Sequence, residues 1–458
     1  MSRMEYRFVF DRDLTVRTIG DPQSAPVRID WQPAPRLHPE LLPMDARDLV
    51  RVAVAVFTAD KLAPRAPRDR RGRVRGLAWQ RTLDLTVPLE NADRWSAAAS
   101  QLAEWLTFLT DDAWTFRFES RRRDPPPSRL LFDDRLPDGR VALFSQGLDS
   151  GMGAALLGRD RRPLVLASVH THGSHQHAVE QVISGLRAVD VDARSVGLWV
   201  RPRMEACEAT QRTRGFLFLL VGAATAVALG ANEIYTFENG VGALNLPASE
   251  AQVGSHNTRA MHPRTFTLAE NLFDLVLDRP ARIVAPFLGM TKGQVCQQLP
   301  LDRLSELARS TISCDEGGAR KRDPPEHCGL CTSCLLRRSA LHAVRGFVDP
   351  TKYRDQATGA HGKFDLESFE HQAARFASLA TWEDLLALDP AARFIDAYLL
   401  RTGPRSDEGQ RHGAVLALLR AHAREARELL TNMRPQITPR EPRPRTLGGQ
   451  RDLFAATR

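Results

Sequence analysis

The sequence has little that would place it at a membrane. Its longest run without a charged residue, Gly215–Asn232, is 18 residues long and rich in alanine and glycine, so a buried helix fits it better than a membrane span. The first ten residues, MSRMEYRFVF, contain no apolar core of a signal peptide. We therefore expect a cytoplasmic protein.

Two common nucleotide-binding patterns are also missing. No Gly-Lys-Ser or Gly-Lys-Thr follows the glycine-containing loop at residues 145–151, which excludes a Walker-type phosphate loop there. Gly147, Gly151 and Gly153 have the wrong spacing for the dinucleotide fingerprint of a Rossmann fold. If this loop binds phosphate, it does so with another pattern.

Positive charge is in excess, but it is confined to two segments. The net charge of the chain is +8. Residues 62–76 carry +5 and residues 434–458 carry +4, so the rest of the chain is close to neutral. A basic body suited to duplex binding is therefore not indicated, and we expect no nucleic-acid partner.

Cysteine is scarce and unevenly placed, because four of the six cysteines lie between residues 314 and 334. Cys314 is followed by Cys328, and then by Cys331 and Cys334 at CxxC spacing. Four thiolates in this pattern predict a closed, structural zinc site, and the CxxCxxC run also permits an iron–sulfur cluster. The metal would hold in place a polar, proline-broken loop that has no hydrophobic core of its own.

The segment that organises the chain is VALFSQGLDSGMGAALLG, residues 141–158. Val141–Phe144 predicts a buried strand, and the small-residue loop Ser145–Gly151 then leads into a helix. This order directs backbone N–H groups and the positive helix end toward an anion. The hydroxyls of Ser145 and Ser150 would add donors, so the segment predicts a phosphate site, although a serine-rich turn before a core helix would look the same.

The chain divides by composition and periodicity into five parts. Residues 124–139 are predicted to form a linker rich in proline and arginine, and residues 434–458 a disordered basic tail. Residues 348–433 predict helices that pack on the domain before them or bind a partner. Residues 1–123 predict an N-terminal α+β domain, with a helix over residues 92–109 and strands at Tyr6–Phe10, Leu49–Phe57, Arg81–Leu89 and Trp114–Phe118.

The remaining part, residues 140–347, alternates strands with helices, which predicts an α/β fold with a parallel sheet and helices on both faces. Ligands of such sheets bind at the carboxyl ends of the strands. After the first strand, we expect a long helix from about Glu205 to Leu229, a shorter one from about His177 to Ala188, and strands at Leu164–His170, Arg194–Leu198, Glu233–Thr236 and Arg282–Phe287.

Several polar residues follow or flank these strands and are candidate ligands. Glu238 and Asn239 would project from the same edge as Asp149, and Lys292 follows the last strand. Ser168 lies near the end of the second strand, and Arg212 is predicted early in the long helix. Histidines stand at positions 170, 172, 175 and 177, where we favour contact with a nucleotide or substrate over metal binding.

The loop and the cysteine segment together resemble one family. The SxGxDS pattern of Ser145–Ser150 is similar to the loop of the PP-loop ATP pyrophosphatases. Residues 328–337, CGLCTSCLLR, resemble the zinc segment of 7-cyano-7-deazaguanine synthase, QueC. The resemblance covers about residues 140–347 and implies a PP-loop (HUP-like) enzyme with a zinc-pinned loop. Such an enzyme uses ATP and Mg²⁺ to adenylate 7-carboxy-7-deazaguanine, and the activated acid reacts with ammonia to give an amide and then a nitrile.

This resemblance implies roles for the candidate residues. Asp149, Ser150 and Lys292 would be catalytic, and Cys314, Cys328, Cys331 and Cys334 would bind Zn²⁺. The nucleotide would be bound by the loop residues Ser145, Gln146, Gly147, Leu148, Asp149, Ser150 and Gly151, together with Ser168, Arg212, Glu238 and Asn239.

Three features depart from the family pattern. Gln146 replaces the first loop glycine, residues 172–176 replace a YGQxH-type segment, and the chain is about twice the usual length. The extra length resembles the QueC-like proteins of bacterial anti-phage operons, notably QatC, which implies a ligase that passes the activated base to an amine of an operon-encoded protein. A free nitrile synthase, a PP-loop tRNA-modifying enzyme and a catalytically inactive scaffold remain alternatives.

Overall fold

A computed structural model describes most of the chain. It covers residues 3–10, 15–16, 27–28, 42–65, 80–122, 138–171, 173–200, 208, 210–246, 258–315, 325–354, 360–395 and 407–433. Most of the first basic segment, most of the predicted linker and the whole predicted tail lie outside the described residues, as does His172.

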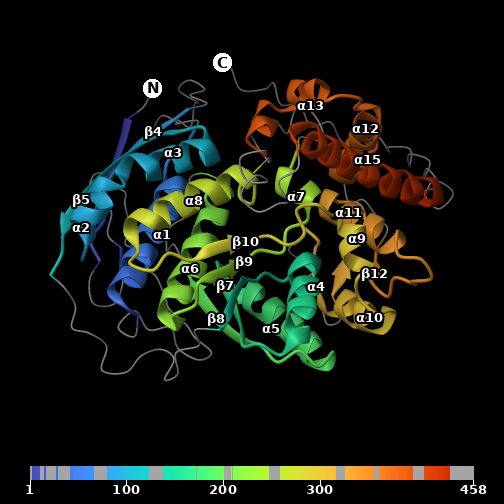
Figure 1. Cartoon of the computed structure of the whole chain (residues 1–458), viewed down its shortest axis with the longest axis horizontal. Coiled ribbons are helices and arrows are strands. Elements are labelled where there is room, and N and C mark those ends of the chain that lie inside the picture. The colour runs from blue at the N-terminus through green and yellow to red at the C-terminus, as the bar shows by residue number, and fades with distance from the viewer. Residues whose placement is uncertain are drawn as a thin grey trace, which may run out of the picture.

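A five-stranded parallel sheet forms the centre of the molecule (Figure 1). Its strand order is β10-β9-β6-β7-β8, so β6, the strand before the Ser145–Gly151 loop, is the middle one. The α/β prediction is therefore confirmed. The strands are β6 (Arg140–Leu143), β7 (Leu164–His170), β8 (Arg194–Trp199), β9 (Glu233–Tyr235) and β10 (Arg282–Val284).

Alternate residues of β6 enter two different hydrophobic cores. Val141 and Leu143 pack with α6 (Arg214–Leu229) and α8 (Pro263–Val276), whereas Ala142 packs on the opposite face. Because side chains alternate along a strand, this central strand is buried on both faces. The opposite face is covered by α4 (Leu148–Leu157), α5 (Gly173–Ala188), α9 (Lys292–Cys296), α10 (Leu301–Ser310) and α11 (Thr332–His342).

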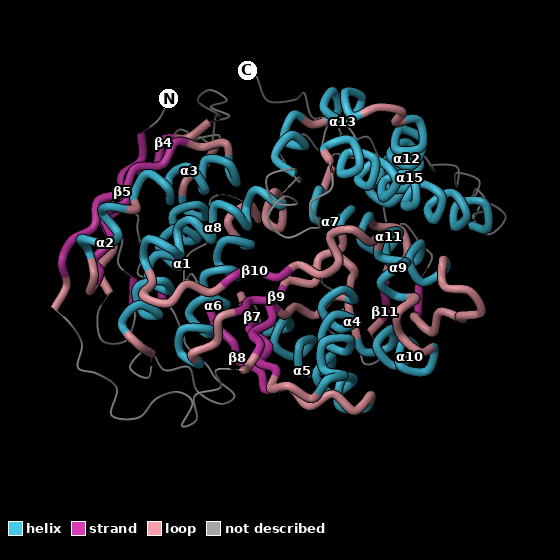
Figure 2. Tube along the Cα trace, in the orientation of Figure 1, coloured by secondary structure: helices cyan, strands magenta, loops and turns pink. Residues whose placement is uncertain are grey.

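A second, three-stranded sheet forms the N-terminal unit. Its strands β1 (Arg3–Arg7), β4 (Thr82–Leu89) and β5 (Ala113–Ser120) are all parallel, in the order β1-β4-β5. Figure 2 shows helices between this sheet and the central one. The predicted helix over residues 92–109 is two helices that meet at Ala98, α2 (Ala92–Ala97) and α3 (Ala99–Thr110). Two short strands, β2 (Thr15–Val16) and β3 (Val27–Arg28), form a separate antiparallel pair.

The predicted strand at Leu49–Phe57 is wrong, because these residues lie within the helix α1 (Met44–Leu62). The prediction relied on valines that alternate at period two. In the structure every residue from Ala46 to Asp60 is buried, so the helix is covered on all sides. A helix without a solvent-facing side needs no polar face, and its valines therefore give no helical period.

The N-terminal unit and one face of the central sheet share a single hydrophobic core. Trp105 of α3 packs edge-on against Phe216 of α6, with ring centroids 4.7 Å apart. Buried ion pairs join the same elements: Arg81 bonds both Asp60 and Asp112, and Thr213 donates to Asp60. The boundary predicted near residue 123 therefore does not separate two hydrophobic cores.

The C-terminal helices form a layer beside the central domain, seen at the upper right of Figure 1. The long helix α15 (Glu408–Met433) packs on α12 (Ala360–Ser378), α13 (Trp382–Leu388) and α11. The region is therefore helical, as predicted, and α15 contacts the central domain through α11. The remaining short elements are the helices α7 (Gly240–Leu244), η2 (Gly158–Asp160) and η5 (Pro390–Phe394) and the paired strands β11 (Glu326–His327) and β12 (Lys352–Tyr353).

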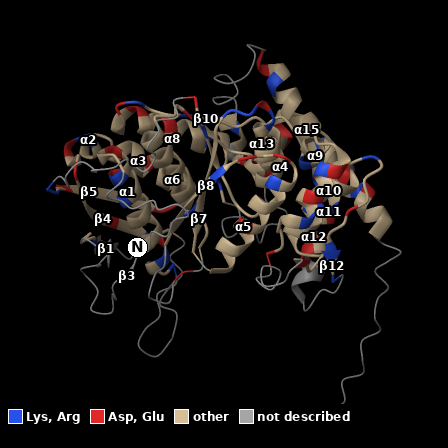
Figure 3. Cartoon of the chain, turned by 90° about the horizontal axis from the view of Figure 1, so that it is seen from below, with Lys and Arg blue, Asp and Glu red and all other residues tan. Residues whose placement is uncertain are grey.

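The uncharged run Gly215–Asn232 contains most of α6, whose residues are nearly all buried between the two sheets. In the described part of the chain, no helix is both long enough and apolar enough to cross a membrane. Figure 3 shows acidic and basic residues interspersed over the helices of that part.

Candidate functional site at the central loop

Two serine hydroxyls close the loop after β6 onto the first turn of α4. The Ser145 and Ser150 hydroxyls lie 3.0 Å apart, and Ser150 Oγ accepts a 3.2 Å bond from the Ser145 backbone N–H. Ser145 Oγ also accepts from the N–H of Gly147, the residue before the helix. The loop is therefore held in a compact turn at the carboxyl edge of the central strand, as the sequence predicts.

Asp149, in the first turn of α4, forms an ion pair with Lys292. The Lys292 Nζ atom lies 2.8 Å from Asp149 Oδ2, and both side chains are less than a fifth exposed. Asp149 Oδ1 is buried and has no hydrogen-bond partner among the described residues. The structure thus brings together Asp149, which follows the first strand of the predicted site, and Lys292, which follows the last one.

Glu238 is a third charged group at this pair. Burial and, to a lesser extent, the negative charge of Asp149 raise the pKa of Glu238 to about 7, and Lys292 opposes the change. Burial lowers the pKa of Lys292, but the carboxylates of Asp149 and Glu238 outweigh this effect and raise it overall. Near neutral pH the cluster therefore holds a lysine cation and a glutamate that is partly protonated.

The segment that carries Lys292 is fixed at its start by a capping box. The Thr291 hydroxyl accepts a bond from the Gln294 N–H, and the Gln294 side chain accepts one from the Thr291 N–H. The Thr291 hydroxyl also donates a 2.5 Å bond to Glu425 of α15. Sequence reasoning missed Glu425, because its helix carries no recognisable motif and lies 134 residues further along the chain.

Asn239, predicted beside Glu238, caps α7. Its side-chain oxygen accepts a 3.1 Å bond from the Gly242 N–H. Its amide nitrogen lies 3.4 Å from Glu238 Oε1. Asn239 therefore shapes the turn that presents Glu238.

The loop is joined directly to the cysteine segment. The Ile312 N–H donates a 2.7 Å bond to the Gln146 carbonyl. A side chain at Gly151 would place its Cβ 2.8 Å from Thr311 Cγ2, so this close approach requires glycine. The loop is thus well hydrogen-bonded although Gln146 stands where the family pattern has glycine. Gln146 is buried.

Arg337, the last residue of the CGLCTSCLLR segment, strengthens this connection between the loop and the cysteines. It is fully buried and donates to the Thr311 hydroxyl at 3.0 Å and to the Ala308 carbonyl at 2.5 Å. Its other guanidinium bonds reach Ser313 and Thr351. One buried cation therefore fixes the residues that lie between the loop and the cysteines.

The four predicted cysteine ligands converge. Their sulfur atoms all lie within 4.8 Å of one another, and those of Cys328 and Cys334 are 3.8 Å apart. Tetrahedral zinc–thiolate bonds of about 2.3 Å separate the sulfurs by about 3.8 Å. A cluster of several irons would spread the four thiolates over different metal atoms. The cysteines Cys314, Cys328, Cys331 and Cys334 therefore fit a single tetrahedral ion such as zinc.

Ser168 and His170 lie toward the carboxyl end of β7. Both are buried, and neither Ser168 Oγ nor His170 Nδ1 has a hydrogen-bond partner among the described residues. Burial lowers the pKa of His170 to about 4, so the ring is neutral at neutral pH. The ring packs against Trp199 on the neighbouring strand.

Arg212 contacts the N-terminal unit. It occupies the turn before α6 rather than the predicted early helix, since α6 begins at Arg214. Its guanidinium donates a 2.6 Å bond to the Thr110 carbonyl at the end of α3. This contact joins the central domain to the N-terminal unit.

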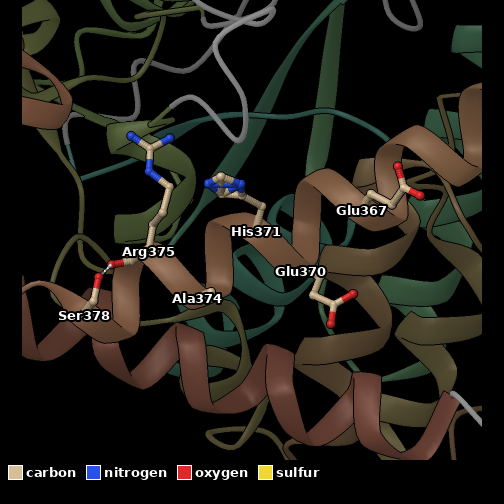
Figure 4. A pocket seen from close by; sticks show the side chains of 6 residues that line it. All are labelled: Glu367, Glu370, His371, Ala374, Arg375 and Ser378. Carbon is tan, nitrogen blue, oxygen red and sulfur yellow. Dashed lines mark hydrogen bonds between the residues drawn. The ribbon is translucent and has the colours of Figure 1, made fainter.

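A separate hollow of about 510 Å³ lies along one side of α12. Figure 4 shows its lining side chains, all from that one helix, with Arg375 and His371 pointing the same way. It contains none of the residues predicted for nucleotide or metal binding. The lining residues are Glu367, Glu370, His371, Ala374, Arg375 and Ser378.

Comparison with known proteins points to one family for the central part of the chain. Residues 207–345 match the family model described as queuosine biosynthesis protein QueC. The 7-cyano-7-deazaguanine synthase of Ralstonia nicotianae is 28% identical over 240 residues, which are 47% of this chain and 98% of that protein.

Two further synthases match over shorter stretches. The enzyme of Allorhizobium ampelinum is 35% identical over 79 residues, 16% of this chain and 28% of that protein. The enzyme of Paracoccus denitrificans is 37% identical over 93 residues, 20% of this chain and 36% of that protein. In these two matches the chain spans only about a third of the relative. The central domain of the chain is thus similar to the QueC family of 7-cyano-7-deazaguanine synthases.

Proposed function

We propose that the protein activates a 7-deazaguanine carboxylic acid with ATP and then joins the acid to an amine. The observation that carries the proposal is the Asp149–Lys292 ion pair beside the Ser145–Gly151 loop, at the carboxyl edge of a parallel sheet. Ligands of such sheets bind at this edge. The similarity to the 7-cyano-7-deazaguanine synthases supplies the substrate class.

In the first step, a carboxylate oxygen of the substrate attacks the α-phosphorus of ATP, and the bond to pyrophosphate breaks. The loop N–H groups and the Ser145 and Ser150 hydroxyls would bind the phosphate oxygens. Lys292 would offset charge that develops on the departing pyrophosphate. Asp149, already paired with this lysine, can lie near phosphate without bringing an uncompensated negative charge.

Two metals have different places in this proposal. A Mg²⁺ ion would be bound by ATP oxygens, with the free Asp149 Oδ1 as the protein ligand at hand. Zinc bound by the four cysteines would be structural, because four protein thiolates close its coordination shell. The zinc site would help to hold the ATP-binding loop in place through the hydrogen bond from Ile312 to Gln146.

In the second step, an amine nitrogen attacks the acyl carbon, AMP leaves with the carboxylate oxygen, and the amine loses a proton. We propose that the amine belongs to a partner protein and that the conjugate serves in anti-phage defence. The proposal rests on the length of the chain, since the 98% of the Ralstonia relative that aligns accounts for only 47% of this chain. Release of a free nitrile after reaction with ammonia is the alternative outcome.

The test is mass spectrometry of reactions that contain ATP, Mg²⁺ and 7-carboxy-7-deazaguanine, with either ammonia or proteins encoded beside this one. We expect AMP and a deazaguanine mass added to a neighbouring protein. Free nitrile would make the protein a synthase, and ATP left intact in both mixtures would contradict the proposal. Asp149→Asn should abolish AMP formation, whereas Asp190→Asn, at a 90%-exposed side chain, should not.

A further inference from the structure

The C-terminal helix α15 contacts both chain segments that supply partners to Asp149. Leu418 approaches the segment after Glu238: a Cβ added at Gly240 would lie 2.5 Å from Leu418 Cδ2. Glu425, seven residues further along the same helix face, bonds Thr291 beside Lys292. The two segments are also joined to each other, because the Gly240 N–H donates a 2.9 Å bond to the Met290 carbonyl. One helix therefore supports both.

Glu425 makes a close contact with the start of α9. In addition to the Thr291 hydroxyl, its carboxylate accepts a backbone hydrogen bond from Gly293. A Cβ at Gly293 would lie only 2.6 Å from Glu425 Oε1, so glycine is needed for the carboxylate to come this near. Lys292 lies between these two bonded residues and has little freedom to move independently of them.

His422, between Leu418 and Glu425 on this face of α15, is also near the cluster. It is buried against the rings of Phe369 and Phe376. Burial lowers the pKa of His422 to about 4, and the charge of Lys292 contributes to the decrease. Of the residues on this face, Glu425 is the one that bonds the residues on either side of Lys292.

We propose that Glu425 is a positioning residue of the ATP site: it holds Thr291 and Gly293 so that the Lys292 ammonium stays paired with the Asp149 carboxylate. The C-terminal helical layer is then part of the activation site, although the match to the QueC family model ends at residue 345. The catalytic role of Lys292 in this inference rests on the proposed function. The contact of Glu425 with Thr291 and Gly293 can be tested without any substrate.

The first test is hydrogen exchange of the full-length protein without ligand. Glu425→Ala removes both bonds at the start of α9, so the backbone amides of residues 292–296 should exchange faster, by about tenfold for a loss near 1.4 kcal/mol. Glu428→Ala is the matched control, because Glu428 is an exposed glutamate one turn further along α15. Equal exchange in the two variants would overturn the proposed contact.

The second test asks whether Glu425 acts through Lys292. AMP formation is measured for the wild type, Glu425→Ala, Lys292→Met and the double variant. We expect Glu425→Ala to lower kcat/KM for ATP about tenfold and to add nothing further in the Lys292→Met background. If turnover of Lys292→Met is too slow to measure, the same cycle is followed by ATP affinity. Losses that add in full would show a general structural effect and overturn the positioning role.

A conservative variant completes the design. Glu425→Gln keeps an oxygen that can accept from the Thr291 hydroxyl and should restore most of the activity lost in Glu425→Ala. Activity as low as that of Glu425→Ala would contradict the proposal. If the wild type forms no AMP with the acid, the proposed function fails, while the exchange experiment still decides whether Glu425 orders the Lys292 segment.

Discussion

The backbone N–H of Ile312 donates a 2.7 Å hydrogen bond to the carbonyl of Gln146, joining the four-cysteine segment to the loop after the central strand. Ile312 belongs to the same buried cluster as Cys314, Cys328 and Cys334. Disordering of the cysteine cluster should therefore also disorder the loop.

Metal removal tests this link. We expect zinc in the purified protein at one ion per chain, and its removal by a chelator should weaken ATP binding at least about tenfold, because the loop would lose its anchor at Ile312. The measurements are metal analysis and calorimetric titration with ATP, followed by addition of zinc to restore binding. Unchanged ATP affinity in the metal-free, folded protein would contradict the link.

Arg337 should be a large contributor to stability. Arg337→Met leaves the Thr311 hydroxyl and the Ala308 carbonyl without their donor in a buried place, so we expect a loss of about 3 kcal/mol in the free energy of unfolding. Denaturant unfolding measures it. Arg345→Met is the control, since Arg345 is exposed on a nearby turn. Similar midpoints for the two variants would show that these bonds are worth little.

The pH dependence of folding stability should show that the pKa of Glu238 is raised in the folded protein. Its pKa rises from an ordinary 4.5 to about 7 in the folded protein, mainly through burial. Between these values the folded state keeps a proton that the unfolded state has released, so the cost of burying Glu238 grows as the pH rises from about 4.5 to 7 and is constant above.

Glu238→Gln should remove this cost. Its Tm should equal that of the wild type near pH 4.5 and exceed it increasingly up to pH 7, as followed by circular dichroism. The exposed Glu383→Gln should track the wild type throughout. A Tm difference that does not change with pH would mean that Glu238 ionises normally.

Arg81 tests whether the N-terminal unit folds with the central domain. Arg81→Met leaves Asp60 and Asp112 buried without their shared partner and should cost about 3–5 kcal/mol. Because one hydrophobic core spans both sheets, we expect wild type and variant to unfold in a single transition seen alike by calorimetry and by tryptophan fluorescence. Two separated transitions would mean that the N-terminal unit unfolds independently of the central domain.

Local chemistry made much of the site predictable. The strand–loop–helix order at Val141–Gly158 and the spacing of the cysteines are short-range patterns, and the structure contains both. Lys292 and Glu238 were predicted at the same edge because parallel strands end together. The Leu49–Phe57 strand was wrong because a helix buried on every side has no polar period.

Long-range packing decided the rest. Nothing near Glu425 in the sequence distinguishes it from its exposed neighbour Glu428, and only the docking of α15 brings it to Thr291. Arg212, predicted among the nucleotide-binding residues, donates to the Thr110 carbonyl, a contact with the N-terminal unit that its sequence neighbourhood did not indicate. Such contacts depend on how whole layers pack, which no local pattern specifies.

The most direct test of the account is the fate of a labelled oxygen. 7-Carboxy-7-deazaguanine that carries ¹⁸O in its carboxylate is incubated with the protein, ATP, Mg²⁺ and an amine, and the nucleotide products are analysed by mass spectrometry. Attack of the carboxylate on the α-phosphorus followed by transfer to the amine leaves one labelled oxygen in AMP and none in pyrophosphate. Unlabelled AMP, or ADP in its place, would contradict the acyl-adenylate and with it the central claim.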